Sequence, residues 1–271
     1  MAYERMGGRT LDYFPCRYDG SNLIFRGPLR PLADRYVAIL GGTETFGRFM
    51  EEPFSETLEL LSGRQTVNLG CVNAGLDAFV ADAGVLDICR GAEVTVIQLP
   101  GAATQSNAFY KVHPRRNDRF ITARQDLLDL FPNVDFSEIH FVGHLLATLQ
   151  SDSQSGFEKV LRELRAEWIR KMNTLLCGIG GRVILVWMAD SKPEAAVCHC
   201  PDRRAPDHVN REMLAAVTPR GVDLLEVVAT EEEIEAGLER MIFDIHEEPA
   251  ASRLLGPVVH QEVARQLAAL I

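Results

Sequence analysis

Short runs of apolar, β-branched residues recur along the chain between longer stretches with helical periodicity, and this alternation constrains the fold most. Five runs are predicted to be strands, at residues 36–40, 66–69, 94–99, 182–188 and 222–228. Three of them are apolar nearly throughout, which is typical of strands buried on both faces. Helical patterns occupy residues 46–62, 75–89, 155–177, 231–243 and 258–270. The alternation predicts an α/β, three-layer αβα sandwich with a five-stranded parallel sheet in the order 2-1-3-4-5.

The domain organisation follows from the length and from two irregular regions. A doubly wound α/β fold can take up all 271 residues as a single domain. Residues 1–35 precede the first strand and contain an Asp19-Gly20 turn signal, so they are predicted to form an N-terminal hairpin or arm. Residues 101–180 are predicted to be a mostly helical excursion before the fourth strand.

Composition narrows the class of partner. The formal net charge of −10 argues against nucleic acid and anionic membranes as partners. The first residues lack the apolar core of a signal peptide, and no apolar run approaches about 20 residues. The six cysteines are scattered rather than arranged as a disulfide framework. We therefore expect a cytoplasmic protein; homo-oligomerisation is left open.

Ligands of parallel α/β sheets bind beyond the carboxyl ends of the strands, so the residues that follow each strand are the first candidates. Gly41-Gly42-Thr43 follows the first strand, and Thr43 could face a ligand or cap a helix. Asn73 and Gly75 follow the second strand, where either could also serve a simple turn. The glycine spacing of a dinucleotide site and the Gly-Lys-Ser/Thr of a P-loop are both missing, so no cofactor is predicted.

Two further polar residues are candidates: Asn107 near the start of the excursion and His260 near the end of the chain. Asn107 follows the third strand, where it could donate to an oxyanion or form a local turn. His260 lies on the first turn of the last predicted helix, behind a Gly256-Pro257 start signal. A lone histidine at such a place is usually a surface or capping residue.

Taken together, these blocks resemble the SGNH (GDSL-like) hydrolase superfamily, which has a flavodoxin-like sheet order. In that family a serine nucleophile follows the first strand in Gly-Asp-Ser-x-x-x-Gly, and ILGGTETFG places Thr43 at the serine position. The resemblance implies Thr43 as nucleophile, His260 as base, and an oxyanion site from Gly42, Asn73, Gly75 and Asn107. The chain also resembles an uncharacterised proteobacterial family with a Gly-Gly-Ser/Thr-Glu-Thr-aromatic-Gly turn, which implies no activity.

Two departures from the SGNH pattern bear on activity. Threonine is a poorer nucleophile than serine because its methyl group crowds the attack, although a neighbouring base can still activate it. Pro257 stands where the family has the aspartate that orients the histidine. In serine proteases the loss of that carboxylate lowers turnover by about 10⁴. Asp244, Glu247 or Glu262 could substitute for it, and an inactive site stays an alternative.

A basic segment, His113-Pro114-Arg115-Arg116-Asn117-Asp118-Arg119, stands out in this acidic chain. Arginine forks bind carboxylate, phosphate or sulfate through two hydrogen bonds, although charge runs more often form solvated loops. The residues predicted to bind substrate are Glu44, Tyr110, His113, Arg115, Arg116 and Arg119.

A second cluster, Cys198-His199-Cys200 with His208, suggests zinc at first sight. The Cys-x-Cys spacing is shorter than that of zinc sites and no second cysteine pair follows, so no metal is predicted.

The sequence leaves three functional hypotheses. The first is an SGNH-like hydrolase or acyltransferase acting on an ester, such as an O-acyl saccharide, with an acidic part bound by the arginine segment. The second is a catalytically inactive SGNH-like module that binds an anionic or glycan ligand through Arg115, Arg116 and Arg119. The third is a transferase of sulfated or phosphorylated groups that uses the glycine turn as an anion cradle.

Overall fold

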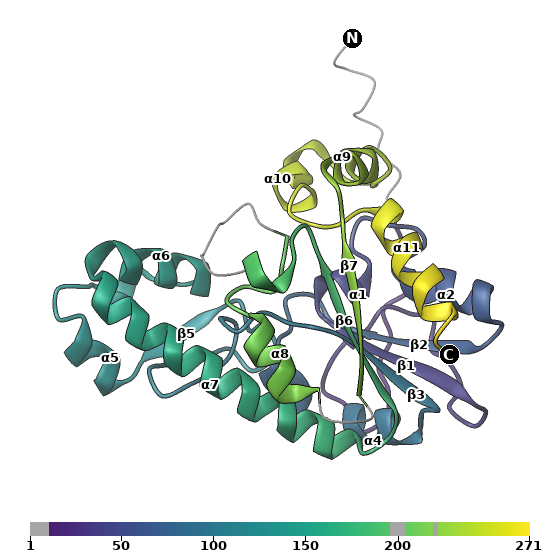
Figure 1. Cartoon of the computed structure of the whole chain (residues 1–271), viewed down its shortest axis with the longest axis horizontal. Helices are drawn as coiled ribbons and strands as arrows, with labels where there is room; N and C mark the ends of the chain where they lie inside the picture. Colours follow the sequence, from purple (N-terminus) through teal and green to yellow (C-terminus); the bar gives the residue numbers. More distant parts are fainter. Residues whose placement is uncertain (1–10, 196–203, 219–221) are drawn as a thin grey trace, which may run out of the picture.

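The fold is built on a five-stranded parallel sheet (Figure 1). The computed structural model describes residues 11–195, 204–218 and 222–271. The sheet order is β2-β1-β3-β6-β7, and every neighbouring pair is parallel. The predicted fold class and the order 2-1-3-4-5 are therefore confirmed. The strands are β1 (Tyr36–Gly41), β2 (Gln65–Gly70), β3 (Val94–Gln98), β6 (Val183–Ala189) and β7 (Val222–Val228).

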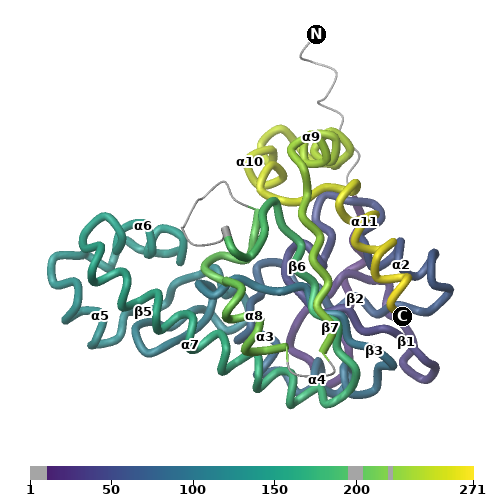
Figure 2. The backbone as a smooth tube through the Cα atoms, in the orientation of Figure 1, coloured from purple at the N-terminus to yellow at the C-terminus, as the bar shows by residue number. Residues whose placement is uncertain are grey.

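Helices cover both faces of the sheet and make it the middle of three layers. One face packs against α3 (Leu76–Val80), α4 (Ala83–Gly91), α7 (Gln154–Ile179) and α8 (Arg211–Val217). The other face packs against α2 (Phe54–Ser62) and α11 (Pro257–Ala268), which lie side by side (Figure 2). All seven residues of β6 are buried, because successive side chains enter the two cores in turn.

Two predicted helices differ from the observed ones. In the predicted 46–62 helix, residues 47–53 are not helical, because α1 (Thr43–Phe46) ends at Gly47 with φ of 72° and α2 begins only after Pro53. The 75–89 pattern becomes α3 and α4, because Asp82 accepts a hydrogen bond from the Val85 amide and starts a new helix.

The N-terminal arm is present as a minimal hairpin. Cys16 and Phe25 pair in an isolated antiparallel bridge around a turn at Asp19-Gly20, where Gly20 has φ of 78°. The Ser21 hydroxyl and the Asn22 amide both donate to Asp82 Oδ2, at 3.1 and 2.9 Å. The arm is thereby attached to the start of α4.

The excursion between β3 and β6 projects to the left of the sheet in Figure 1. It contains an antiparallel β4–β5 hairpin that the sequence patterns did not predict, and the basic segment is the loop of that hairpin. Its elements before α7 are β4 (Tyr110–Val112), β5 (Phe120–Ala123), α5 (Gln125–Leu130), η1 (Phe136–Glu138) and α6 (Val142–Asp152).

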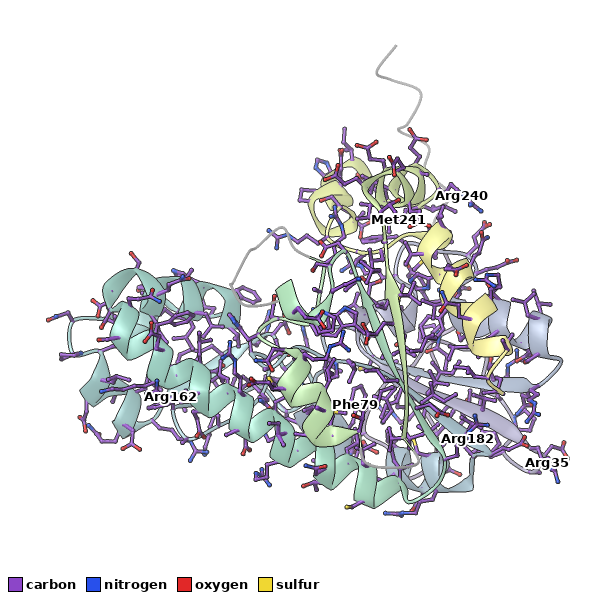
Figure 3. All side chains as sticks on the ribbon, viewed as in Figure 1. Arg35, Phe79, Arg162, Arg182, Arg240 and Met241 are labelled. Atoms are coloured by element: carbon purple, nitrogen blue, oxygen red, sulfur yellow. The ribbon has the colours of Figure 1, made fainter. Side chains whose placement is uncertain are left out.

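A small third core lies beyond the carboxyl ends of the strands, at the top of Figure 1. Phe49 packs there with Met241 and Ala251, and Figure 3 labels Met241 beside α9. Arg35 and Arg182, also labelled, lie at the opposite, amino edge of the sheet. The remaining elements are η2 (Pro193–Ala195), α9 (Glu231–Glu239), η3 (Ile245–Glu247) and α10 (Glu248–Ala251).

The cysteine and histidine cluster of the sequence lies only partly within the described residues. Cys198, His199 and Cys200 lie outside the described residues. His208 is buried, and its ring packs edge-on against Phe157. Among the helices of the described part, none has the length and apolarity needed to cross a bilayer.

Candidate functional site

The turn after β1 is held by side chains that pack closely against its backbone at the carboxyl edge of the sheet. A Cβ on Gly41 would lie 2.1 Å from Thr45 Oγ1 and 2.9 Å from Gln98 Oε1, so only glycine fits there. The Gly42 amide donates to Gln98 Oε1 at 3.2 Å. Gln98 is the last residue of β3, and its side chain therefore supports the turn from the neighbouring strand.

Thr43 is bound to the loop that follows β2. Its hydroxyl donates to Asn73 Oδ1 at 3.3 Å and accepts from the Asn73 amide at 3.0 Å. Asn73 has a φ of 58°, a left-handed conformation that asparagine tolerates better than most residues. Thr43 is the first helical residue and Gly42 occupies the N-cap, so Thr43 does not cap α1. The structure therefore brings Thr43 and Asn73 together as neighbours.

His260 does not form the expected pair with Thr43. Its side chain is fully buried, and its Nδ1 accepts a hydrogen bond from the Phe54 amide at 3.0 Å. This bond assigns the proton of the neutral ring to Nε2, which faces Glu44 Oε2 at 3.5 Å. Since Nδ1 is occupied and Nε2 carries the proton, the ring has no lone pair left for a threonine hydroxyl.

The expected oxyanion donors are occupied by other parts of the protein. The amides of Gly42, Asn73 and Gly75 donate to the side chains of Gln98, Thr43 and Asn117. The Asn107 side chain donates to Gln105 O and accepts from the Phe109 and Tyr110 amides, so it forms the local turn. The sequence had allowed this local role for Asn107, because asparagine often stabilises turns in this way.

Two of the six predicted substrate-binding residues serve the fold instead. Tyr110 is fully buried, its hydroxyl donates to Ala103 O at 2.7 Å, and burial raises the pKa of its phenol. Glu44 accepts from the Leu255 amide through Oε1 at 3.0 Å, while Oε2 faces His260. Both side chains are therefore committed to internal contacts.

The arginine loop, residues 113–119, connects β4 to β5. It lies against the loop after β2, whose Asn73 binds the Thr43 hydroxyl. The Asn117 amide donates to Asn73 O at 2.9 Å, so the two loops are joined by their backbones. This contact places the arginine-rich segment at the carboxyl edge of the sheet, next to the turn after β1.

The three arginines of this loop have different surroundings. Arg116 pairs with Asp118 at 3.2 Å, and the Arg119 guanidinium lies 5.7 Å from the centre of the Phe141 ring. Arg115 is exposed, and within the described part of the chain its guanidinium has no ion-pair or hydrogen-bond partner. Burial raises the pKa of the Cys71 thiol, and the positive charge of Arg115 acts against that rise.

His113 uses one of its two ring nitrogens within the loop. Its Nδ1 accepts hydrogen bonds from the amides of Arg115 and Arg116, at 3.3 and 3.1 Å. The proton of the neutral ring is thereby assigned to Nε2, which has no partner among the described residues. A donor and a guanidinium thus occur on the same short loop.

Two residues of this region were not singled out from the sequence. Gln98 had a signal, because it is the polar end of an otherwise apolar strand. Asn117 is fully buried and had none, because it is surrounded in the sequence by charged residues that are typical of an exposed loop.

Comparisons with solved structures give weak likenesses. One is a gut microbial diltiazem-metabolizing enzyme, with a TM-score of 0.40 and 10% identity over 86% of this chain and 46% of that one. Another is the lipase Lip_vut3 from a goat rumen metagenome, with a TM-score of 0.40 and 11% identity over 83% of this chain and 100% of that one. The comparison with curated proteins gives no match.

The comparison with family models is decisive on membership. One family model matches residues 1–271. This chain belongs to the family described as domain of unknown function DUF6473.

Proposed function

We propose that this chain binds a small anionic ligand, such as a carboxylate, a phosphate or an acidic saccharide, at the carboxyl edge of its sheet. The observation that carries the proposal is the backbone hydrogen bond from Asn117 to Asn73 at 2.9 Å. It joins the arginine loop to the loop after β2, near the edge at which ligands of parallel sheets usually bind. Among the described residues, the guanidinium of Arg115 on this loop has no ion-pair or hydrogen-bond partner.

The chemistry of the exposed donors favours an anion. Arg115 offers a planar fork of N–H donors that matches the oxygens of carboxylate and phosphate. Arg116 and Arg119 contribute less, because Asp118 and Phe141 already contact their guanidiniums. Arg115 is therefore the principal ligand contact, with His113 as a neighbouring donor.

The first test is calorimetric titration with inorganic phosphate and with D-glucuronate. A charge-assisted hydrogen bond contributes about 1.5–3 kcal/mol, so Arg115→Ala should weaken binding by about 10- to 100-fold. Arg162→Ala is the matched control, because Arg162 is an exposed arginine on the projecting part of α7 (Figure 3). Equal affinity in the Arg115 variant, or no binding by the wild type, would refute the proposal.

A second candidate is hydrolysis of an ester by Thr43, as the SGNH resemblance implies. It is favoured by the half-buried Thr43 hydroxyl, which is held against Asn73 in the turn directly after β1. To act as its base, His260 would first have to release the Phe54 amide. The hydrolase therefore needs a rearrangement that the binding function does not.

Turnover of p-nitrophenyl acetate tests the hydrolase. If Thr43 is the nucleophile, Thr43→Ala should lower turnover at least about a hundredfold, whereas Thr174→Ala on the exposed face of α7 should not. If Thr43→Ala matches the wild type, Thr43 is not a nucleophile and only the binding function stays.

A further inference from the structure

We propose that Asn117 is the positioning residue of the anion site, because it holds the arginine loop where His113 and Arg115 can bind a ligand. The inference rests on the proposed binding function and goes beyond it. It assigns the geometry of the site to a residue that no ligand needs to touch.

Asn117 makes three hydrogen bonds through its side chain. It is fully buried, and its Oδ1 accepts from the Gly75 amide at 2.6 Å and from the Ala78 amide at 3.4 Å. Its Nδ2 donates to His113 O at 2.8 Å. The carboxamide therefore joins the beginning of α3 to the first residue of the arginine loop.

The backbone of Asn117 adds a fourth connection, because its amide donates to Asn73 O at 2.9 Å. Asn73 is the residue that binds the Thr43 hydroxyl. A continuous chain of hydrogen bonds therefore runs from the turn after β1, through Asn73 and Asn117, to His113. Buried polar groups that are hydrogen-bonded in this way help to hold a loop in one conformation.

The same chain of hydrogen bonds reaches the two proposed ligand donors, His113 and Arg115. Asn117 holds the His113 carbonyl, and the His113 ring accepts from the amides of Arg115 and Arg116. The orientation of the imidazole and the path of the backbone at Arg115 thus depend on where Asn117 holds the start of the loop.

Gly75 packs tightly at the junction between the start of α3 and the arginine loop. A Cβ at this position would lie 2.5 Å from Thr104 O and 3.1 Å from Asn117 Oδ1. Because one of these atoms belongs to the backbone, the segments would have to separate to accept a methyl group. Gly75→Ala therefore disturbs the same junction without removing a polar side chain.

Asn107 provides a matched comparison within the same chain. It is also buried, and its carboxamide also accepts from two amides and donates to one carbonyl. Its three partners, Gln105, Phe109 and Tyr110, lie within three residues of it in the chain, and none of them is hydrogen-bonded to Asn73 or His113 in the described structure. Replacing it removes an equivalent set of hydrogen bonds without releasing the arginine loop.

The experiment compares Asn117→Ala with Asn107→Ala by thermal unfolding and by calorimetric titration with inorganic phosphate. Both variants should lower the melting temperature by similar amounts. Only Asn117→Ala should weaken phosphate binding, by about tenfold, because a site tolerates only small displacements of its donors. Equal affinities in the two folded variants would overturn the inference.

Two further measurements distinguish failure of the positioning role of Asn117 from failure of the proposed binding function. Gly75→Ala should weaken phosphate binding as well, whereas Gly143→Ala, whose Cβ would meet nothing within 4 Å, should leave it unchanged. Hydrogen exchange should accelerate over residues 113–119 in Asn117→Ala and stay at the wild-type rate there in Asn107→Ala. If the wild type binds no phosphate, the proposed function fails, and unchanged exchange in Asn117→Ala would refute the positioning role independently.

Discussion

His260 shows how one buried side chain can join distant parts of the chain. Its Nδ1 receives the Phe54 amide at the start of α2, its Nε2 faces Glu44 in α1, and the residue itself belongs to α11. Its ring lies 5.5 Å from the Phe54 ring, centre to centre. These contacts make His260 a structural residue that holds the last helix against the turn after β1.

His260→Ala should therefore destabilise the fold by about 2–4 kcal/mol, since it leaves the Phe54 amide buried without a partner and opens a cavity. Urea unfolding measures this loss. The exposed His246 serves as the control, and His246→Ala should stay within about 0.5 kcal/mol of the wild type. A His260 variant as stable as the His246 variant would contradict the structural role.

The three arginines of the arginine loop have identical side chains but differ in their capacity to bind an anion. Asp118 neutralises Arg116, and the Phe141 ring lies near the Arg119 guanidinium. Arg115 differs from them only in its neighbours. Binding capacity at the residue scale is therefore set by which charges are already paired.

At the scale of the elements, Asp82 links helix formation to attachment of the arm. One carboxylate oxygen caps α4 through the Val85 amide, at 3.0 Å. The other accepts from the Ser21 hydroxyl and the Asn22 amide. The side chain is buried, so each of these hydrogen bonds is shielded from water.

Asp82→Ala should cost about 2–4 kcal/mol, because the cap and the buried arm contacts are lost together. Limited proteolysis should then cut within residues 11–35 sooner than in the wild type. Asp135→Ala is the control, because Asp135 caps the short η1 helix with an exposed carboxylate. Arm cleavage at the wild-type rate in the Asp82 variant would show that other contacts hold the arm.

At the scale of the whole molecule, the central strands couple the two cores. Leu185 and Trp187 of β6 enter one core, and Ile184 and Val186 enter the other. A substitution that disturbs the packing of either core therefore affects the same strand. The single-domain organisation, the cytoplasmic location and any homo-oligomer stay predictions from the sequence.

The sequence by itself determined the sheet. Strands buried on both faces must be apolar throughout, and their alternation with helices leaves few topologies that keep right-handed crossovers. These rules depend only on local pattern and chain connectivity. They predicted the strand order and placed the loops after β1 and β2 at one edge.

Only the tertiary structure decided which polar atoms are available for function. Whether Thr43, Asn107, His260 or Arg115 can meet a ligand depends on partners that in part lie far away in the chain, such as Phe54 for His260. A hydrogen bond once formed inside the protein removes that donor or acceptor from chemistry. The local turn of Asn107 was one of the roles that the sequence allowed. The pairing of His260 with Phe54 arises from packing between elements, so residue type and spacing could not reveal it.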